Sequence, residues 1–183
     1  YIFEEAVFEA ARTAGLRCVG GEAVFAFPSA ACAGPEAALQ ATRALAEHCV
    51  GDDRLRVAVN PHSVYTTTPE ILAACRDLAG ELGLPLHIHL SETREETELC
   101  LKNHGKRPVA LCRDLGLLDL PCTLAHVVDA DEEELDILAR HKAVAAHNPS
   151  SNMKLASGVA PLPAMLERGL AVGLGTDGPA SNN

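Results

Sequence analysis

The stretch PLHIHLSET, residues 85–93, brings two histidines and a glutamate together at the end of an apolar run. Neutral imidazole and carboxylate groups are natural ligands for divalent ions of the zinc type, and a carboxylate beside such an ion can move protons. Side chains alternate between faces in a strand, so His87 and His89 point the same way and Glu92 follows just past the strand end. The spacing therefore allows either histidine to bind a metal, with His87 about 6 to 7 Å deeper along the strand.

Titratable side chains end five successive apolar segments: His62, His89, His126, His147 and Asp177. A single histidine at a strand end usually has a structural, hydrogen-bonded role, but five consecutive segments that end this way favour a shared site. His89 and Asp177, on different strands, could hold a catalytic metal that keeps one position open for water.

Two of these candidates also have a purely structural explanation. Glu92 lies in SETREETE, which can begin a helix with Ser91 or Thr93 as its cap. Asp177 lies in GTDGPASNN, where an Asp-Gly pair is typical of a turn. The residues alone leave both alternatives open.

The periodicity of apolar residues predicts six helices that alternate with six strands. The helices are expected over 4–14, 35–50, 69–83, 106–116, 131–141 and 161–168, and the strands over 16–25, 54–62, 85–92, 121–127, 143–149 and 170–178. Apolar strands of this kind are buried on both faces, which indicates a parallel sheet covered by helices. A doubly wound open sheet and a (β/α)8 barrel both fit this alternation.

The polar strand ends favour the barrel, because its strand ends converge on one mouth whereas an open sheet would spread them along a line. We therefore expect an α/β chain that forms a partial (β/α)8 TIM-type barrel of about six β/α units. A single domain over residues 1–183 is predicted, with the first strands of the barrel outside it.

Composition narrows the class of protein. The chain has 183 residues, 48% of them hydrophobic, and a formal net charge of −10, which disfavours nucleic acid and anionic membranes as partners. Its seven cysteines contain no CxxC pair, as expected for reduced thiols in a cytoplasmic protein. Neither a leader peptide nor an apolar run long enough to cross a bilayer is evident.

Five segments, in this order, resemble the amidohydrolase superfamily: NPHSVYTTTPE, IHLSET, LAHV, AHNPSSNMKLASGVAP and GLGTDGPASNN. The resemblance runs from about residue 15 to the end and is closest to the 5-methylthioadenosine/S-adenosylhomocysteine deaminase branch, a chlorohydrolase-like family. It implies a metal-dependent barrel hydrolase.

The resemblance also implies a role for each matching residue. The metal ligands would be His89 and Asp177, which leaves His87 as a packed residue of the barrel wall. The cofactor would be one divalent metal ion, with zinc expected and iron, nickel or manganese as alternatives. The implied catalytic residues are Glu92 as proton shuttle, His126 as the group that orients water, and Asp177 as general base. The implied substrate contacts are His62, Glu92 and Asp177, with His147 and Asn148 shaping the mouth.

The implied reaction is hydrolytic deamination at C6 of an adenine nucleoside, 5′-methylthioadenosine or S-adenosylhomocysteine, with a small-molecule substrate and a homo-oligomer as an open option. Guanine or cytosine deamination and s-triazine hydrolysis remain alternatives. The family's HxH ligand pair is not found before His62, and its small β-domain is missing as well. The chain is therefore expected to be a fragment, or else a truncated barrel without catalytic activity.

Overall fold

A computed structural model describes residues 1–141 and 143–182 of the chain. Its helices and strands alternate over most of this length. In chain order they are α1 (Glu4–Ala14), β1 (Cys18–Gly20), β2 (Ala23–Val24), α2 (Pro35–His48), β3 (Leu55–Val57), β4 (Asn60–Pro61), α3 (Pro69–Leu82), β5 (Leu86–Leu90), α4 (Arg94–His104), α5 (Pro108–Asp114), the 3-10 helix η1 (Leu117–Asp119), β6 (Cys122–His126), α6 (Glu132–His141), β7 (Val144–His147), α7 (Pro149–Lys154), α8 (Leu162–Glu167) and β8 (Ala171–Leu174).

The four short N-terminal strands are two interrupted strands that run side by side. β1 pairs with β3 and β2 pairs with β4, both in parallel and with the same sequence offset. The interruption lies at Gly21, where an added Cβ would come within 1.9 Å of the Ala58 carbonyl oxygen. The predicted strands over 16–25 and 54–62 are therefore present, each divided where the two backbones approach too closely for a side chain.

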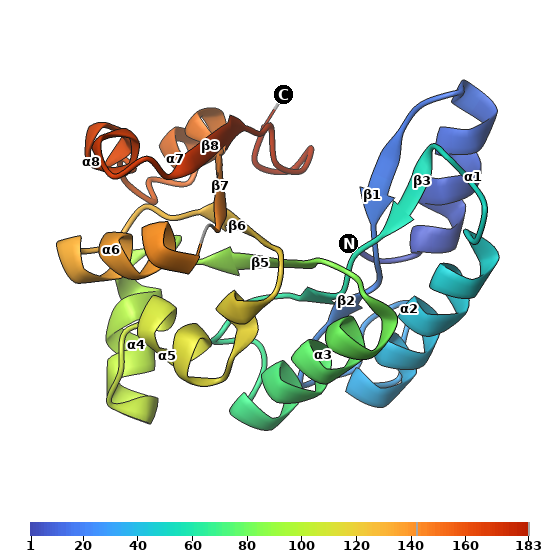
Figure 1. Ribbon diagram of the computed structural model, residues 1–183, viewed down its shortest axis with the longest axis horizontal. Helices are drawn as coiled ribbons and strands as arrows, with labels where there is room; N and C mark the ends of the chain where they lie inside the picture. Colours follow the sequence, from blue (N-terminus) through green and yellow to red (C-terminus); the bar gives the residue numbers. More distant parts are fainter. Residues whose placement is uncertain (142, 183) are drawn as a thin grey trace.

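The remaining strands form a parallel sheet in the order β5-β6-β7-β8. Two parallel bridges, Val59 to Leu86 and Ser63 to His89, attach the N-terminal strands to β5. Figure 1 shows the helices, among them α2, α3, α5 and α6, along one side of this curved series of strands. The architecture is a partial β/α barrel, as the polar strand ends predicted.

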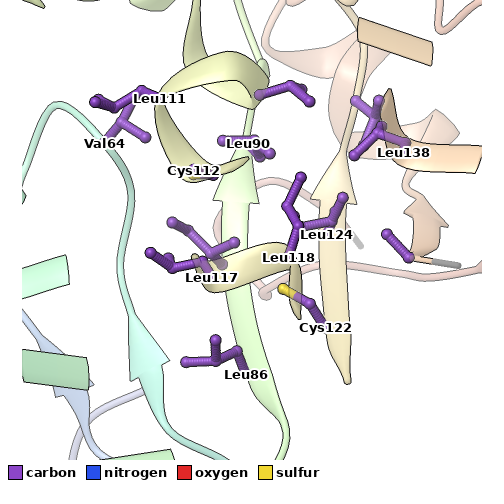
Figure 2. Packing of buried hydrophobic residues seen from close by; sticks show 14 of the residues in the cluster. Val64, Leu86, Leu90, Leu111, Cys112, Leu117, Leu118, Cys122, Leu124 and Leu138 are labelled. Carbon is purple, nitrogen blue, oxygen red and sulfur yellow. The ribbon is translucent and has the colours of Figure 1, made fainter. Parts of the chain in front are cut away.

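The main core lies between the strands and their covering helices. Leu86, Ile88 and Leu90 of β5 and Leu124 of β6 are almost completely buried, together with side chains of the helices. Figure 2 shows several of these residues packed around β5 and β6. Burial of one such leucine contributes about 1.5–3 kcal/mol, so this packing fixes the strands whose ends carry the candidate residues.

The helices differ from the prediction after β5 and after β7. The helix expected over 106–116 is shorter, as α5, and a separate helix α4 precedes it. Thr93 caps α4 by accepting a hydrogen bond from the Glu96 amide, so the helix start anticipated in SETREETE is present. The prediction missed α7 because its six residues are too few to establish a helical period.

All seven cysteines are free thiols, five of them buried. Within the described residues, no helix has both the length and the apolar character required to cross a lipid bilayer.

Candidate metal centre and active site

Three side chains from different strand ends meet at the carboxyl edge of the sheet. One ligand atom each from His89, His126 and Asp177 lies within 4.8 Å of the other two. The parallel register brings them together, because β5 pairs with β6, which pairs with β7, and β7 with β8. Two imidazoles and a carboxylate suit a divalent metal ion, so this group can hold one.

His89 has one ring nitrogen committed to the backbone. Its Nδ1 lies 2.8 Å from the carbonyl oxygen of His62, which can only accept a hydrogen bond, so Nδ1 carries the proton. Nε2 is then the basic nitrogen, directed to the site. This arrangement prepares a histidine to bind a metal, because the outer hydrogen bond fixes both tautomer and ring orientation.

His87 lies on the same face of β5 but deeper, with its ring centroid 6.3 Å from that of His89. It lines a cavity of about 410 Å³, together with His62, His89 and Asp177. Burial, the largest of several causes, lowers the pKa of His87 to about 4, which fits the expected packed position in the wall. The expected hydrogen bond is not found, because the His87 side chain faces the cavity and has no hydrogen-bond partner among the described residues.

His126 is only 1% exposed, and a buried neighbour also holds its ring. Its Nδ1 lies 2.9 Å from Oδ1 of Asn152, which leaves Nε2 toward the site, 3.7 Å from the Glu92 carboxylate. His126 therefore lies both with the candidate ligands and beside the candidate proton shuttle. From this position it can orient a water molecule or serve as a third ligand.

Asp177 receives two short hydrogen bonds on one carboxylate oxygen, 2.6 Å from the Ser151 hydroxyl and 2.7 Å from that of Ser181. Burial favours its neutral form, but these hydrogen bonds, one from the Gly178 amide and the charge of His126 outweigh burial and hold the pKa of Asp177 below its usual value. The carboxylate therefore stays ionised at neutral pH, as a metal ligand must.

Glu92 is not the helix cap, since Thr93 has that role. The Glu92 side chain is 17% exposed and faces His126. The Ser157 hydroxyl lies 3.4 Å from its other carboxylate oxygen, close enough for a long hydrogen bond from the loop after α7. Thr93 therefore caps the helix, and the adjacent Glu92 is free to face the candidate site.

His62 follows β4 at the wall of the same cavity. Its ring lies between those of Phe25 and His89, with centroids 4.6 and 4.7 Å away, and its Nδ1 is 3.0 Å from the Thr66 hydroxyl. Burial, with the nearby His89, lowers the pKa of His62 to about 4. His62 is therefore a neutral hydrogen-bonding group at neutral pH.

The two remaining candidates lie at the end of β7. His147 is outside the group of three, and its Nδ1 is buried without a hydrogen-bond partner among the described residues. Asn148 is buried against Gly175, where an added Cβ would lie 2.1 Å from the Asn148 side-chain oxygen. Asn148 lines the cavity beside Asp177, as expected for a residue that shapes the mouth.

The backbone is strained after β5, β6 and β8, but not at His147 and Asn148 after β7. Ser91, His126, Val127 and Asp177 all have positive φ, at 50°, 77°, 49° and 58°. Such conformations cost about 1–3 kcal/mol for residues other than glycine and tend to cluster at functional sites. The strain therefore marks the same edge of the sheet as the side-chain cluster.

Sequence reasoning missed the support that α7 provides. Ser151 and Asn152, adjacent and almost completely buried, bind Asp177 and His126 respectively. The available signal was the small polar run after Asn-Pro in AHNPSSN, directly after a buried strand.

A larger cavity of about 860 Å³ is lined by residues of α1 and α2 and by none of the site residues.

Residues 2–183 match the model of the amidohydrolase family. The chain is 72% identical over 183 residues to a 5-methylthioadenosine/S-adenosylhomocysteine deaminase of Desulfovibrio desulfuricans. The aligned region covers 100% of this chain and 42% of that protein. The chain thus spans less than half the length of this relative.

Two solved structures have the same fold. An adenosine deaminase from Xanthomonas campestris with bound zinc superimposes with a TM-score of 0.95 at 30% identity, over 100% of this chain and 42% of the other. An atrazine chlorohydrolase from Arthrobacter aurescens complexed with zinc gives 0.89 at 25% identity, over 98% and 42%. These likenesses confirm the predicted partial barrel.

Proposed function

Because this chain belongs to the amidohydrolase family, we propose that the protein carrying it deaminates an adenine nucleoside by hydrolysis, with 5′-methylthioadenosine or S-adenosylhomocysteine as substrate. The observation that carries the proposal is the grouping of His89, His126 and Asp177 at one strand edge, with Glu92 3.7 Å from His126. Support comes from the 72% identical relative that bears this deaminase name.

The proposed cofactor is one divalent metal ion, with zinc favoured by the two zinc-bound structures and iron, nickel or manganese as alternatives. His89 and Asp177 would hold it, since one presents a free Nε2 and the other a carboxylate kept ionised. When bound, such an ion lowers the pKa of a coordinated water to about 7. The donor chemistry of the described residues fits this ion.

The proposed proton transfers follow from the positions of three groups. Asp177 takes a proton from the attacking water, while Glu92 protonates ring nitrogen N1 and makes C6 electrophilic. Asn152 holds Nδ1 of His126, so that the basic Nε2 faces the water and orients the water molecule. Water adds at C6, and Asp177 passes the proton that it took to the amino group. The C6–N bond then breaks and ammonia leaves, while the proton of the C6 hydroxyl returns to Glu92 as the C6 carbonyl forms.

His62 is proposed to contact the substrate from the cavity wall. Its Nδ1 is engaged by Thr66, so Nε2 is the nitrogen left for a substrate, and its low pKa keeps the ring from adding a cation beside the metal. Residues 1–183 are proposed to act as a single partial barrel domain. A small-molecule substrate and a cytoplasmic location complete the proposal, and the free cysteines are consistent with a reducing compartment.

The test is Glu92→Gln in the full-length protein that carries this sequence. General acid-base catalysis contributes about 10²–10⁴ in rate, so turnover should nearly vanish while metal content stays unchanged. Ammonia release measures the rate, and elemental analysis measures the metal. The matched control is Glu98→Gln, at an exposed position on α4, which should behave as wild type.

Retained activity in the Glu92→Gln protein would remove Glu92 from the mechanism. A substrate panel of adenine nucleosides, guanine, cytosine and an s-triazine tests the substrate class, because an atrazine chlorohydrolase shares the fold. Release of ammonia from guanine or cytosine, or of chloride from a chloro-s-triazine, in preference to ammonia from adenine nucleosides would replace the proposed substrate. Absence of bound metal from the active protein would exclude the proposed metal centre.

A further inference from the structure

Glu96, in the first turn of α4, binds backbone outside its own helix. Its carboxylate oxygens lie 3.0 Å from the amide nitrogen of Ser91 and 2.8 Å from that of Glu92, and each accepts one hydrogen bond. In an ordinary capping box, a glutamate at this position would bind the amide of the capping residue, here Thr93. Glu96 reaches further back and holds the loop that carries the proposed proton shuttle.

Helix stability alone does not account for this arrangement. Thr93 already caps α4 through its hydroxyl. Glu96 is only 4% exposed, and burial, the first of several causes, raises the pKa of Glu96 to about 7. A buried carboxylate is costly to place and is justified only where its hydrogen bonds fix a particular geometry.

The peptide groups held by Glu96 connect two strained strand ends. Ser91, at φ 50°, accepts hydrogen bonds on its carbonyl oxygen from the amides of Val128 at 2.9 Å and Asp129 at 2.8 Å. These amides directly follow His126 and Val127, both at positive φ. One peptide unit therefore ties the Glu92 loop to the His126 turn.

A second buried acid secures the other end of this connection. Arg107 donates one hydrogen bond to the Asp129 carbonyl at 2.6 Å and another to Glu134 at 2.8 Å, while Glu134 also accepts from the Val109 amide at 2.9 Å. The loop segments that follow β5 and β6 are thus fixed to α4 on one side and to α5 and α6 on the other.

We propose that Glu96 is a positioning residue for the Glu92 carboxylate: its two hydrogen bonds to the Ser91 and Glu92 amides hold Glu92 facing His126. This inference rests on the proposed function, because it assigns Glu96 an effect on turnover that acts through Glu92. Glu96 itself does not contact the reacting atoms.

The experiment is a double-mutant cycle in the full-length, metal-loaded protein. Glu96→Gln replaces one acceptor by an amino group that faces an N–H, so one of the two amides loses its partner. The expected result is a fall in kcat of about 10- to 100-fold with KM and metal content little changed. In a Glu92→Gln background the same change should have less than about a twofold effect, because its action passes through Glu92.

A second measurement is independent of activity. Hydrogen exchange of the peptide that contains Ser91 and Glu92 should accelerate in Glu96→Gln, while peptides of α8 remain unchanged. Glu98→Gln on the exposed face of α4 is the control for both measurements and should match wild type. If Glu96→Gln does not fold, Glu96→Asp takes its place, since it keeps the charge but is shorter and should lose one of the two contacts.

An equal loss in both Glu92 backgrounds, or unchanged exchange at Ser91 and Glu92, would overturn the positioning role. If the wild-type protein releases no ammonia from any substrate, the proposed function fails. Hydrogen exchange still decides in that case whether Glu96 holds the loop.

Discussion

Helices α4 and α7 both follow strands of the sheet and both support the candidate site, but they do so in different ways. From α7, Ser151 and Asn152 bind the side chains of Asp177 and His126. From α4, Glu96 binds the backbone amides of Ser91 and Glu92. One helix orients functional groups, and the other locates the chain that carries them.

The chemistry of each helix matches what it holds. Neutral hydroxyl and amide groups suffice to orient an ionised carboxylate and an imidazole, whereas two backbone N–H groups are held by a single carboxylate with two acceptor oxygens. A variant on α7 should therefore affect one functional side chain at a time, whereas a variant at Glu96 should affect two connected loops. Of the supporting side chains on the two helices, Glu96 is a titratable group, whereas Ser151 and Asn152 are not.

The largest expected effect comes from the titration of Glu96 on α4. The pKa of Glu96 is raised to about 7 in the folded protein. At pH values between the ordinary pKa of a glutamate and about 7, Glu96 is therefore protonated in the folded state and ionised in the unfolded state. This contribution to stability is fully present below about pH 4.5 and is lost as the pH rises to about 7. The free energy of unfolding of wild type should therefore fall relative to Glu96→Gln over this range, by up to about 3 kcal/mol.

Urea unfolding of both proteins at several pH values measures this difference. Glu98→Gln, at an exposed position of the same helix, is the matched control. If the difference in the free energy of unfolding between wild type and Glu96→Gln is constant across this pH range, Glu96 makes no pH-dependent contribution to stability. Helix α4 would then not differ from α7 in this respect.

The next effect concerns Asn152. Asn152→Leu keeps a similar volume but removes the acceptor from the buried Nδ1 of His126, so the ring loses its fixed tautomer and orientation. Groups that hold a functional histidine in this way typically contribute about 10- to 100-fold in activity or metal affinity. Steady-state deamination and metal content should show a loss of this size.

Met153→Leu is the matched control, since Met153 is the next residue on α7 and is 73% exposed. Wild-type kinetics from Asn152→Leu would show that the His126 ring does not depend on α7.

The smallest effect is expected at Ser151. Ser151→Ala removes one hydrogen bond from Asp177, but Ser181 still donates to the same oxygen. Metal affinity, measured by competition with a chelator, should weaken by no more than about tenfold. Ser151→Ala combined with Ser181→Ala should lose more than the product of the single effects, because each hydroxyl compensates for the other. Simple multiplication of the two losses would contradict this shared role.

The sequence allowed prediction of the parts that follow from alternation and parallel pairing. Apolar strands with polar ends predicted that His89, His126 and Asp177 would meet at one edge, and the structure brings them together. Their roles in catalysis stay predictions. Asn152 could not be identified because its importance comes from a contact with His126 between two separate β/α units, and no local period encodes such a contact.

Two other features also depended on three-dimensional context. The division of the first strand at Gly21 arises from the approach of the Ala58 carbonyl, which lies on a neighbouring strand. The lack of a hydrogen-bond partner for the His87 side chain among the described residues depends on what lies opposite β5 across the cavity, and position along the strand does not determine that.

The Ser91 peptide has a consequence for motion. Because its N–H is held by Glu96 and its carbonyl by the amides of Val128 and Asp129, the segments that carry Glu92 and His126 cannot open separately. Glu92, the proposed proton shuttle, and the ring of His126, proposed to orient the water, should therefore move together on the timescale of turnover.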